Sequence, residues 1–141
     1  MTPHQIHLIR SSFEPLKPLA ATVAAAFYAQ LFARDPALRA LFRGGDMHEQ
    51  GERLMQMLSA AIDLLDRPGA LIPVLLRLGQ RHVDYGVASE HYDSVGAALL
   101  DTLAAGLGDG FTAEVREAWT TMYGFVARKM QEGAVSAVLA A

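Results

Sequence analysis

The apolar residues of this chain recur every three or four positions, and this spacing continues along almost the whole sequence. Such a period places apolar side chains on one face of an α-helix, whereas a half-buried β-strand needs alternation at every second position. Alternation of that kind is almost absent. The sequence therefore predicts an all-α fold, in which amphipathic helices bury one face each against their neighbours.

Turn and cap signals divide the pattern into about seven helices. Pro3 suits the first turn of a helix, and Asp35 predicts the N-cap of a short helix that ends at Phe42. Ser89 and Thr112 are the expected N-caps of the last two helices. We expect breaks between helices at the Gly- and Pro-rich positions 43–46, 67–69, 86 and 106–110.

Composition limits the classes of function. A chain of 141 residues predicts one domain, 1–141, and 52% hydrophobic residues is a high share for a small domain. A net charge of −3 without a basic run argues against a nucleic-acid partner. The absence of cysteine excludes disulfides, Cys-ligated zinc and iron–sulfur clusters.

No membrane span or secretory leader is expected. The apolar stretch 19–33 is shorter than a membrane span, and no short basic leader precedes it. We interpret this stretch as an alanine-rich core helix and expect a cytoplasmic protein, which the absence of cysteine also fits.

Five stretches, taken together, carry a resemblance to a known family. They are FYAQLFARDPALRALF (27–42), EQGERL (49–54), RHVDYGV (81–87), HYDSVG (91–96) and AWTTMYGF (118–125). In this order and at this spacing they resemble the globins, specifically the bacterial single-domain haemoglobins of the Vitreoscilla and Hell's Gate types and the globin domain of flavohaemoglobins. The resemblance implies a globin fold of about seven helices that enclose a haem b.

His82 lies on an apolar stripe with Leu71, Leu75 and Leu78, in a helix that Gly86 is expected to end. A histidine in such a place is often a hydrogen-bonded core residue, and that alternative stays open on the residues alone. The sequence has no cysteine and no second histidine four positions away to build a zinc site. A haem needs one axial imidazole and a hydrophobic slot. By resemblance, His82 is the proximal ligand of the haem iron.

The resemblance also implies a distal side. Tyr28 and Gln50 match residues whose O–H and N–H groups stabilise the negative charge of bound oxygen, and Leu54 follows Gln50 by one turn. Phe42 matches the phenylalanine that stacks on the porphyrin. The alternatives are a core tyrosine bonded to a carbonyl and a solvent-exposed glutamine.

On the proximal side, Val87, Val95 and Leu99 are expected to line the haem slot, and Arg81 to pair with a haem propionate. Ordinary core packing and surface exposure are the respective alternatives. His91 is expected to be solvated.

The resemblance implies a hydrogen-bonded tyrosine and glutamate that support the proximal histidine. Tyr92 matches the tyrosine, although a plain core tyrosine is equally compatible with the sequence. The glutamate position holds Ala134, so the set is incomplete unless Glu132 fills the place.

The expected function is reversible binding of oxygen, and of other diatomics such as nitric oxide and carbon monoxide, rather than stand-alone catalysis. The alternative is a nitric oxide dioxygenase. That enzyme would need a separate reductase, because the sequence has no Gly-rich dinucleotide fingerprint and no room for a reductase after the globin. A haem-free helical module, the third possibility, would not explain why Tyr28, Gln50 and His82 occur together.

Overall fold

The structure, a computed structural model, describes residues 1–42 and 45–140. Within these ranges it contains six α-helices and three short 3-10 helices and no strand, which confirms the all-α prediction. The α-helices are α1 (Pro3–Phe13), α2 (Ala20–Arg34), α3 (Met47–Asp63), α4 (Pro68–Asp84), α5 (His91–Leu107) and α6 (Ala113–Ala140). The 3-10 helices are η1 (Glu14–Leu19), η2 (Pro36–Phe42) and η3 (Gly108–Gly110). Residues 43 and 44 of the break predicted at 43–46 lie outside the described residues.

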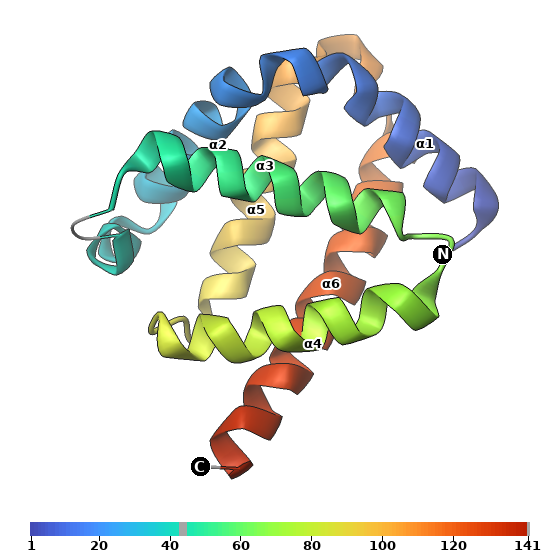
Figure 1. The fold of residues 1–141 in the computed structure, drawn as a ribbon. Coiled ribbons are helices and arrows are strands. Elements are labelled where there is room, and N and C mark those ends of the chain that lie inside the picture. The colour runs from blue at the N-terminus through green and yellow to red at the C-terminus, as the bar shows by residue number, and fades with distance from the viewer. Residues whose placement is uncertain (43–44, 141) are drawn as a thin grey trace.

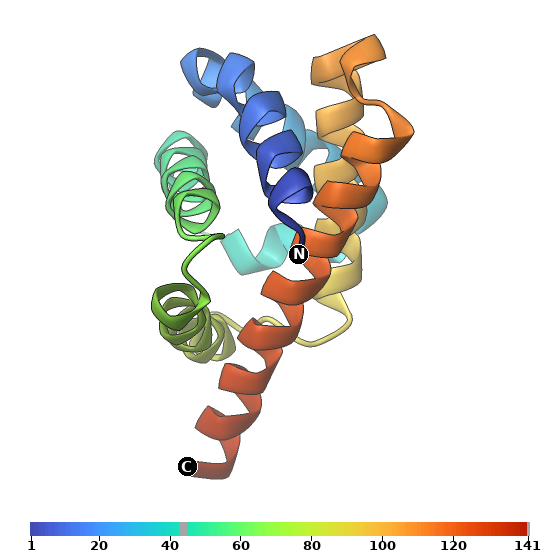
Figure 2. The same cartoon turned by 90° about the vertical axis from the view of Figure 1, so that its right-hand side faces the viewer.

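The helices form two groups that face each other. In Figure 1, α3 lies above α4 and both lie in front of α5 and α6, and Figure 2 shows the same division from the side. The C-terminal part of α6 extends beyond the other helices in both views. α6 packs against α4, α1 and α5, whereas α2 packs against α5 and α3. The helices that carry Gln50 and His82 therefore lie on the same side of the fold, and each packs mainly on another helix, α3 on α2 and α4 on α6.

The buried apolar side chains form two clusters. The larger cluster draws on every α-helix and contains the fully buried Trp119, whose Nε1 donates to Ser12 Oγ at 2.9 Å. The smaller cluster belongs to α2, η2 and α5, and its buried members are Phe27, Tyr28, Leu31, Leu38 and Ala98. A small domain usually has one contiguous core. A core in two parts is what a chain would show if a group other than its own side chains lay between the parts.

Two predicted helix starts are confirmed. Pro3 occupies the first turn of α1, where Thr2 forms a capping box with Gln5. Thr112 Oγ1 accepts a hydrogen bond from Val115 N at 3.2 Å at the start of α6. Both caps follow from local sequence, because the capping side chain reaches a backbone N–H only two or three residues further on.

Two other predicted caps are wrong. The Asp35 carboxylate accepts a hydrogen bond from Ser94 Oγ at 3.2 Å, so it ties η2 to α5. α5 begins at His91 and not directly after Ser89, and His91 Nδ1 accepts the backbone N–H of Ala88 at 2.9 Å. This half-buried His91 is therefore a structural residue, not a solvated one. The Asp35 side chain therefore bonds to another helix instead of capping its own, and His91 instead of Ser89 accepts the backbone N–H in the turn before α5.

The run Pro3–Arg34 is long and apolar enough to cross a membrane, by length and composition only, and 28% of its window is buried. Core helices of soluble proteins meet the same criterion. Here the run is divided into α1, η1 and α2, and η1 contains Pro15 and Pro18. In α2 the buried residues Ala24, Phe27, Tyr28 and Leu31 share one face that packs on α5 and α3, as expected of a core helix.

Candidate functional site

The imidazole of His82 lies half-buried in the last turn of α4, and its hydrogen bond fixes its tautomer. Nδ1 lies 2.7 Å from the backbone carbonyl oxygen of Leu78. A carbonyl only accepts, so Nδ1 carries the proton and Nε2 keeps its lone pair in the neutral ring. Burial lowers the pKa of His82, the Leu78 carbonyl opposes that change, and the charge of Arg81 adds to it. The ring is thus held as a neutral imidazole with Nε2 free to bind a metal.

The end of α4 connects Val87 to His82 through the main chain. Gly86 has φ +85°, a left-handed conformation that glycine adopts without strain. Gly86 N donates to Val83 O at 3.0 Å, and Val87 N donates to His82 O at 3.0 Å. These two bonds form a Schellman motif. Gly86 thereby turns the chain so that the main chain of Val87 lies against that of His82.

Tyr28 is the centre of an aromatic group on the other side of the candidate site. Its ring makes an edge contact with Phe42 at a centroid distance of 5.4 Å and stacks on Phe32 at 5.9 Å. The side chain is only 8% exposed. Burial raises the pKa of Tyr28 to about 12, and the side chain of Gln50 acts against that rise. The phenol is therefore a neutral donor at any physiological pH.

The apolar residues predicted to line the site are divided between the two clusters, and Leu99 joins them. Phe42, Leu54 and Val95 pack against the smaller cluster, Val87 packs against the larger, and Leu99 contacts both. All five are only half-buried by the polypeptide. Apolar side chains that the polypeptide leaves partly uncovered can pack against a flat apolar group.

Tyr92 does not support His82 in the way that the sequence predicted. Its hydroxyl is buried and has no hydrogen-bond partner among the described residues, and burial raises the pKa of Tyr92. Its backbone carbonyl accepts a bond of 2.6 Å from the hydroxyl of Tyr123. The Tyr123 ring lies against Gly96, where a Cβ atom would approach the ring within 2.7 Å. The pair anchors the first turns of α5 on α6 and leaves one buried polar atom unpaired.

Glu132 does not replace the missing glutamate. Its side chain is exposed and lies 3.0 Å from the ammonium group of Lys129, on the outer face of α6. The neighbouring Gly133 is buried and faces α4. The proximal position thus has Ala134 and no carboxylate from this turn. The partner of the His82 ring is a backbone carbonyl, that of Leu78, four residues earlier in the same helix, which the sequence did not single out.

The remaining charged and polar candidates lie at the surface. Arg81 is exposed. His48 pairs with Glu52 at 2.9 Å, with the histidine side chain 70% exposed, so it points away from the site.

A bare metal ion lacks a ligand set here. In residues 1–42 and 45–140, no group of three or more His, Asp or Glu side chains could hold a metal ion. Any metal at His82 Nε2 must therefore bring most of its ligands with it. A porphyrin supplies four nitrogens and an apolar plane. The lone pair of His82, the half-buried apolar boundary and the unpaired Tyr92 hydroxyl fit such a group.

Comparison with known proteins agrees with this geometry. The family model of the globins matches residues 25–130. Over 134 residues, 93% of this chain, the sequence is 35% identical to a flavohemoprotein of Xylella fastidiosa, of which it covers 33%. It is also 34% identical over 131 residues to a flavohemoprotein of Bordetella parapertussis, and 30% identical over 139 residues to one of Vibrio cholerae.

The chain belongs to the globin family. These three matches cover 90% or more of this chain, whereas the chain spans only 32–35% of the length of the relatives. The matched region includes η2, α3, α4 and α5, and therefore both sides of the candidate site.

Proposed function

We propose that this globin binds haem b and reversibly binds oxygen, and also nitric oxide and carbon monoxide, at the iron. Membership of the globin family implies the haem. The observation that carries the proposal is His82, whose Nδ1 is engaged by Leu78 while Nε2 is free. A bound haem would supply a ferrous iron with an open coordination position for a diatomic ligand.

The residues of this chain would share the work on two sides. His82 would hold the haem iron through Nε2, and Phe42, Val87, Val95 and Leu99 would pack on the porphyrin and exclude water. Arg81 would reach a propionate from its exposed position.

On the opposite side, Tyr28 would donate a hydrogen bond to the bound ligand, with Gln50 as second donor and Leu54 limiting the space. The high pKa of Tyr28, about 12, supports this role because the phenol keeps its proton.

An absorption spectrum tests the central claim. The purified protein should show a Soret band that shifts on reduction and again on addition of carbon monoxide. His82→Ala should lose tight haem binding while it keeps most of its helical circular dichroism. The control His48→Ala, on the exposed side of α3, should keep the wild-type spectrum. A His82→Ala protein with full haem content and an unchanged ferrous spectrum would refute the assignment.

The similarity to flavohemoproteins favours nitric oxide dioxygenase as the second candidate. This reaction uses oxygen and nitric oxide and needs electrons to return ferric iron to the ferrous state. A separate cytoplasmic reductase would supply them. Sustained consumption of nitric oxide by the ferrous, oxygenated protein with an added flavin reductase and NADH would favour the enzyme, and a single turnover would favour ligand binding.

A further inference from the structure

The helix that carries His82 meets α6 backbone to backbone. A Cβ atom on Gly79 would lie 1.7 Å from the carbonyl oxygen of Met130, and one on Gly133 would lie 2.1 Å from that of Leu76. Each helix therefore places a glycine against the other's main chain. We call this contact the glycine crossing and define it by Leu76, Gly79, Met130 and Gly133.

The glycine crossing includes the turn that orients the imidazole. Leu76 and Gly79 contact α6, and Leu78, which lies between them, accepts the hydrogen bond from His82 Nδ1. His82 follows Gly79 by three residues, and residues so spaced lie close on a helix surface. The separation of α4 from α6 thus sets where this turn, and the ring bonded to it, lies in the fold.

We propose that Gly79 and Gly133 are positioning residues for the His82 imidazole. The inference rests on the proposed function, because it concerns the ligand of the haem iron. With Ala134 where the resemblance implies a supporting glutamate, and with the Tyr92 hydroxyl unpaired, the main-chain contact with α6 and the Leu78 carbonyl hold the ring.

Gly79→Ala and Gly133→Ala test the inference, because Cβ atoms do not approach other atoms within 3.0 Å and the helices would have to separate. The same two helices offer matched controls. Gly69 in α4 and Gly124 in α6 have nothing within 4 Å of a built Cβ atom. In an open helical position alanine is the better helix former, so Gly69→Ala and Gly124→Ala should be neutral or stabilising.

In the haem-loaded protein, the two crossing variants should shift the Fe–His band in the resonance Raman spectrum of the ferrous state. They should also release haem about tenfold faster, the order expected for overpacking at a close contact. The two controls should stay within about twofold of the wild type. An unchanged band and rate in Gly79→Ala and Gly133→Ala would overturn the inference.

A loss of stability alone must be distinguished from a displaced ring. Ile9 is fully buried in α1, and Ile9→Val lowers stability without touching the glycine crossing. It should leave the Fe–His band at its wild-type position. If it shifts the band as far as Gly79→Ala does, the effect is general destabilisation and the inference is wrong.

Measurements on the haem-free protein separate this inference from the proposed function. In the wild type, amide protons of residues 76–83 should exchange as slowly as those of α6 near Met130, and the ring signals of His82 should shift in both crossing variants. Rapid exchange throughout 76–83 would refute the inference even if the protein binds haem. Slow exchange in the wild type and shifted ring signals in both variants, in a protein that binds no haem, would refute the proposed function and leave the glycine crossing in place.

Discussion

At the scale of single residues, His82 and Tyr92 differ in whether their buried polar atoms have partners. His82 Nδ1 donates to Leu78, whereas the Tyr92 hydroxyl has no partner among the described residues. An unsatisfied buried hydroxyl costs about 1–3 kcal/mol, so its retention needs a reason. Tyr92 lies one turn before Val95 in α5, so its hydroxyl is an open hydrogen-bonding position on a helix that the proposed haem would contact.

Tyr28→Phe should raise the dissociation rate of oxygen much more than that of carbon monoxide. The phenol hydrogen bond acts on negative charge that oxygen carries and carbon monoxide largely lacks. A buried hydrogen bond to a charged group contributes about 1.5–3 kcal/mol, which corresponds to a tenfold or larger change in rate. Stopped-flow measurements with both gases on one preparation check this, since carbon monoxide serves as the internal control.

Gln50→Leu should change the oxygen rate in the same direction but by less, because Gln50 is only half-buried in the first turn of α3. Equal changes for both gases in Tyr28→Phe would show that the phenol does not face the bound ligand.

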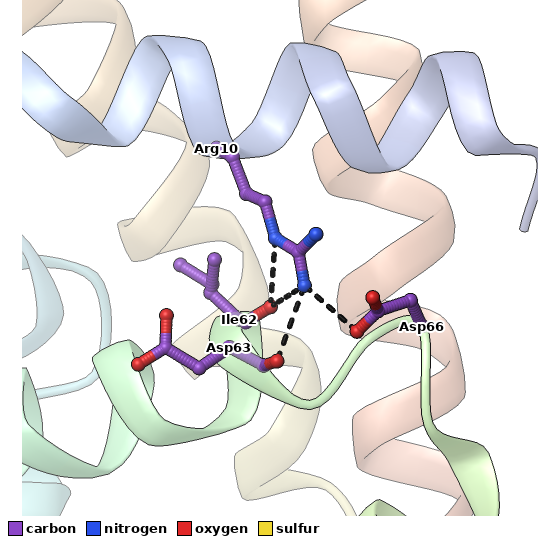
Figure 3. A network of polar contacts seen from close by, with 4 residues as sticks. All are labelled: Arg10, Ile62, Asp63 and Asp66. Carbon is purple, nitrogen blue, oxygen red and sulfur yellow. Dashed lines mark hydrogen bonds and ion pairs between the residues drawn. The ribbon is translucent and has the colours of Figure 1, made fainter.

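At the scale of the helices, Arg10 connects α1 to the end of α3 (Figure 3). Its Nη2 atom donates to the carbonyl oxygens of Ile62 and Asp63, each at 3.1 Å, and to Asp66 Oδ1 at 3.0 Å. The last carbonyls of a helix have no intrahelical donor, so the guanidinium supplies one. The hydrogen bond from Arg10 is also the main cause that lowers the pKa of Asp66.

Arg10→Met keeps most of the side-chain length and removes these bonds, so it should lower the free energy of unfolding by about 1–2 kcal/mol. The Arg10 side chain is 37% exposed, which limits the effect. Arg53→Met is the matched control, because its pair with Glu49 is 3.7 Å long and largely exposed. Urea unfolding of the haem-free proteins gives both values, and equal losses in the two variants would contradict the role of Arg10.

The helix ends show which N-caps can be predicted from neighbouring residues alone. Thr112 was predicted as a cap and is one, since its partner Val115 lies three residues away. Asp35 and Ser89 were predicted on the same rule and fail, because Asp35 bonds to Ser94 and the turn before α5 uses His91. Asp46, which caps α3 by accepting from His48 N and Glu49 N, was not predicted, although an aspartate before an amphipathic stretch is the usual signal.

At the scale of the whole molecule, three tyrosines that are buried or half-buried make the free energy of unfolding depend on alkaline pH. Burial raises the pKa of Tyr28, Tyr92 and Tyr123, that of Tyr28 from its ordinary value of 10.0 to about 12. Above pH 10 the unfolded chain loses these protons while the folded chain keeps them. The stabilisation is therefore complete below pH 10 and is lost as the pH rises, for Tyr28 between 10.0 and about 12.

The free energy of unfolding of the haem-free protein should fall above pH 10, by up to about 1.4 kcal/mol per pH unit for each proton difference. Tyr28→Phe should show a shallower fall. Denaturation at pH 9, where these phenols are protonated in both states, isolates the packing effect of the substitution. Identical slopes in the two proteins would show that Tyr28 ionises as easily in the folded chain as in the unfolded one.

The sequence by itself determined which segments are helical, in what order they follow, and that the chain is a globin. The helical segments follow from local properties. The spacing of apolar residues specifies a helix, and a proline or a capping threonine at its first turn acts only on residues of that same turn. It also named Tyr28, Phe42, Leu54, Val95 and Leu99 as site residues on two sides of a haem, and the structure places all five in or against the smaller cluster.

Only the tertiary structure decided which polar atoms of the candidate site have hydrogen-bond partners and how closely α4 and α6 approach each other. Glu132 and Ala134 are two positions apart, yet the rotation of α6 turns the carboxylate to Lys129 and solvent. Gly79 and Gly133 are unremarkable in their own helices and meet only because α4 crosses α6. The two glycine contacts join residues more than fifty positions apart, and they depend on the rotation and separation of whole helices, which no local pattern encodes.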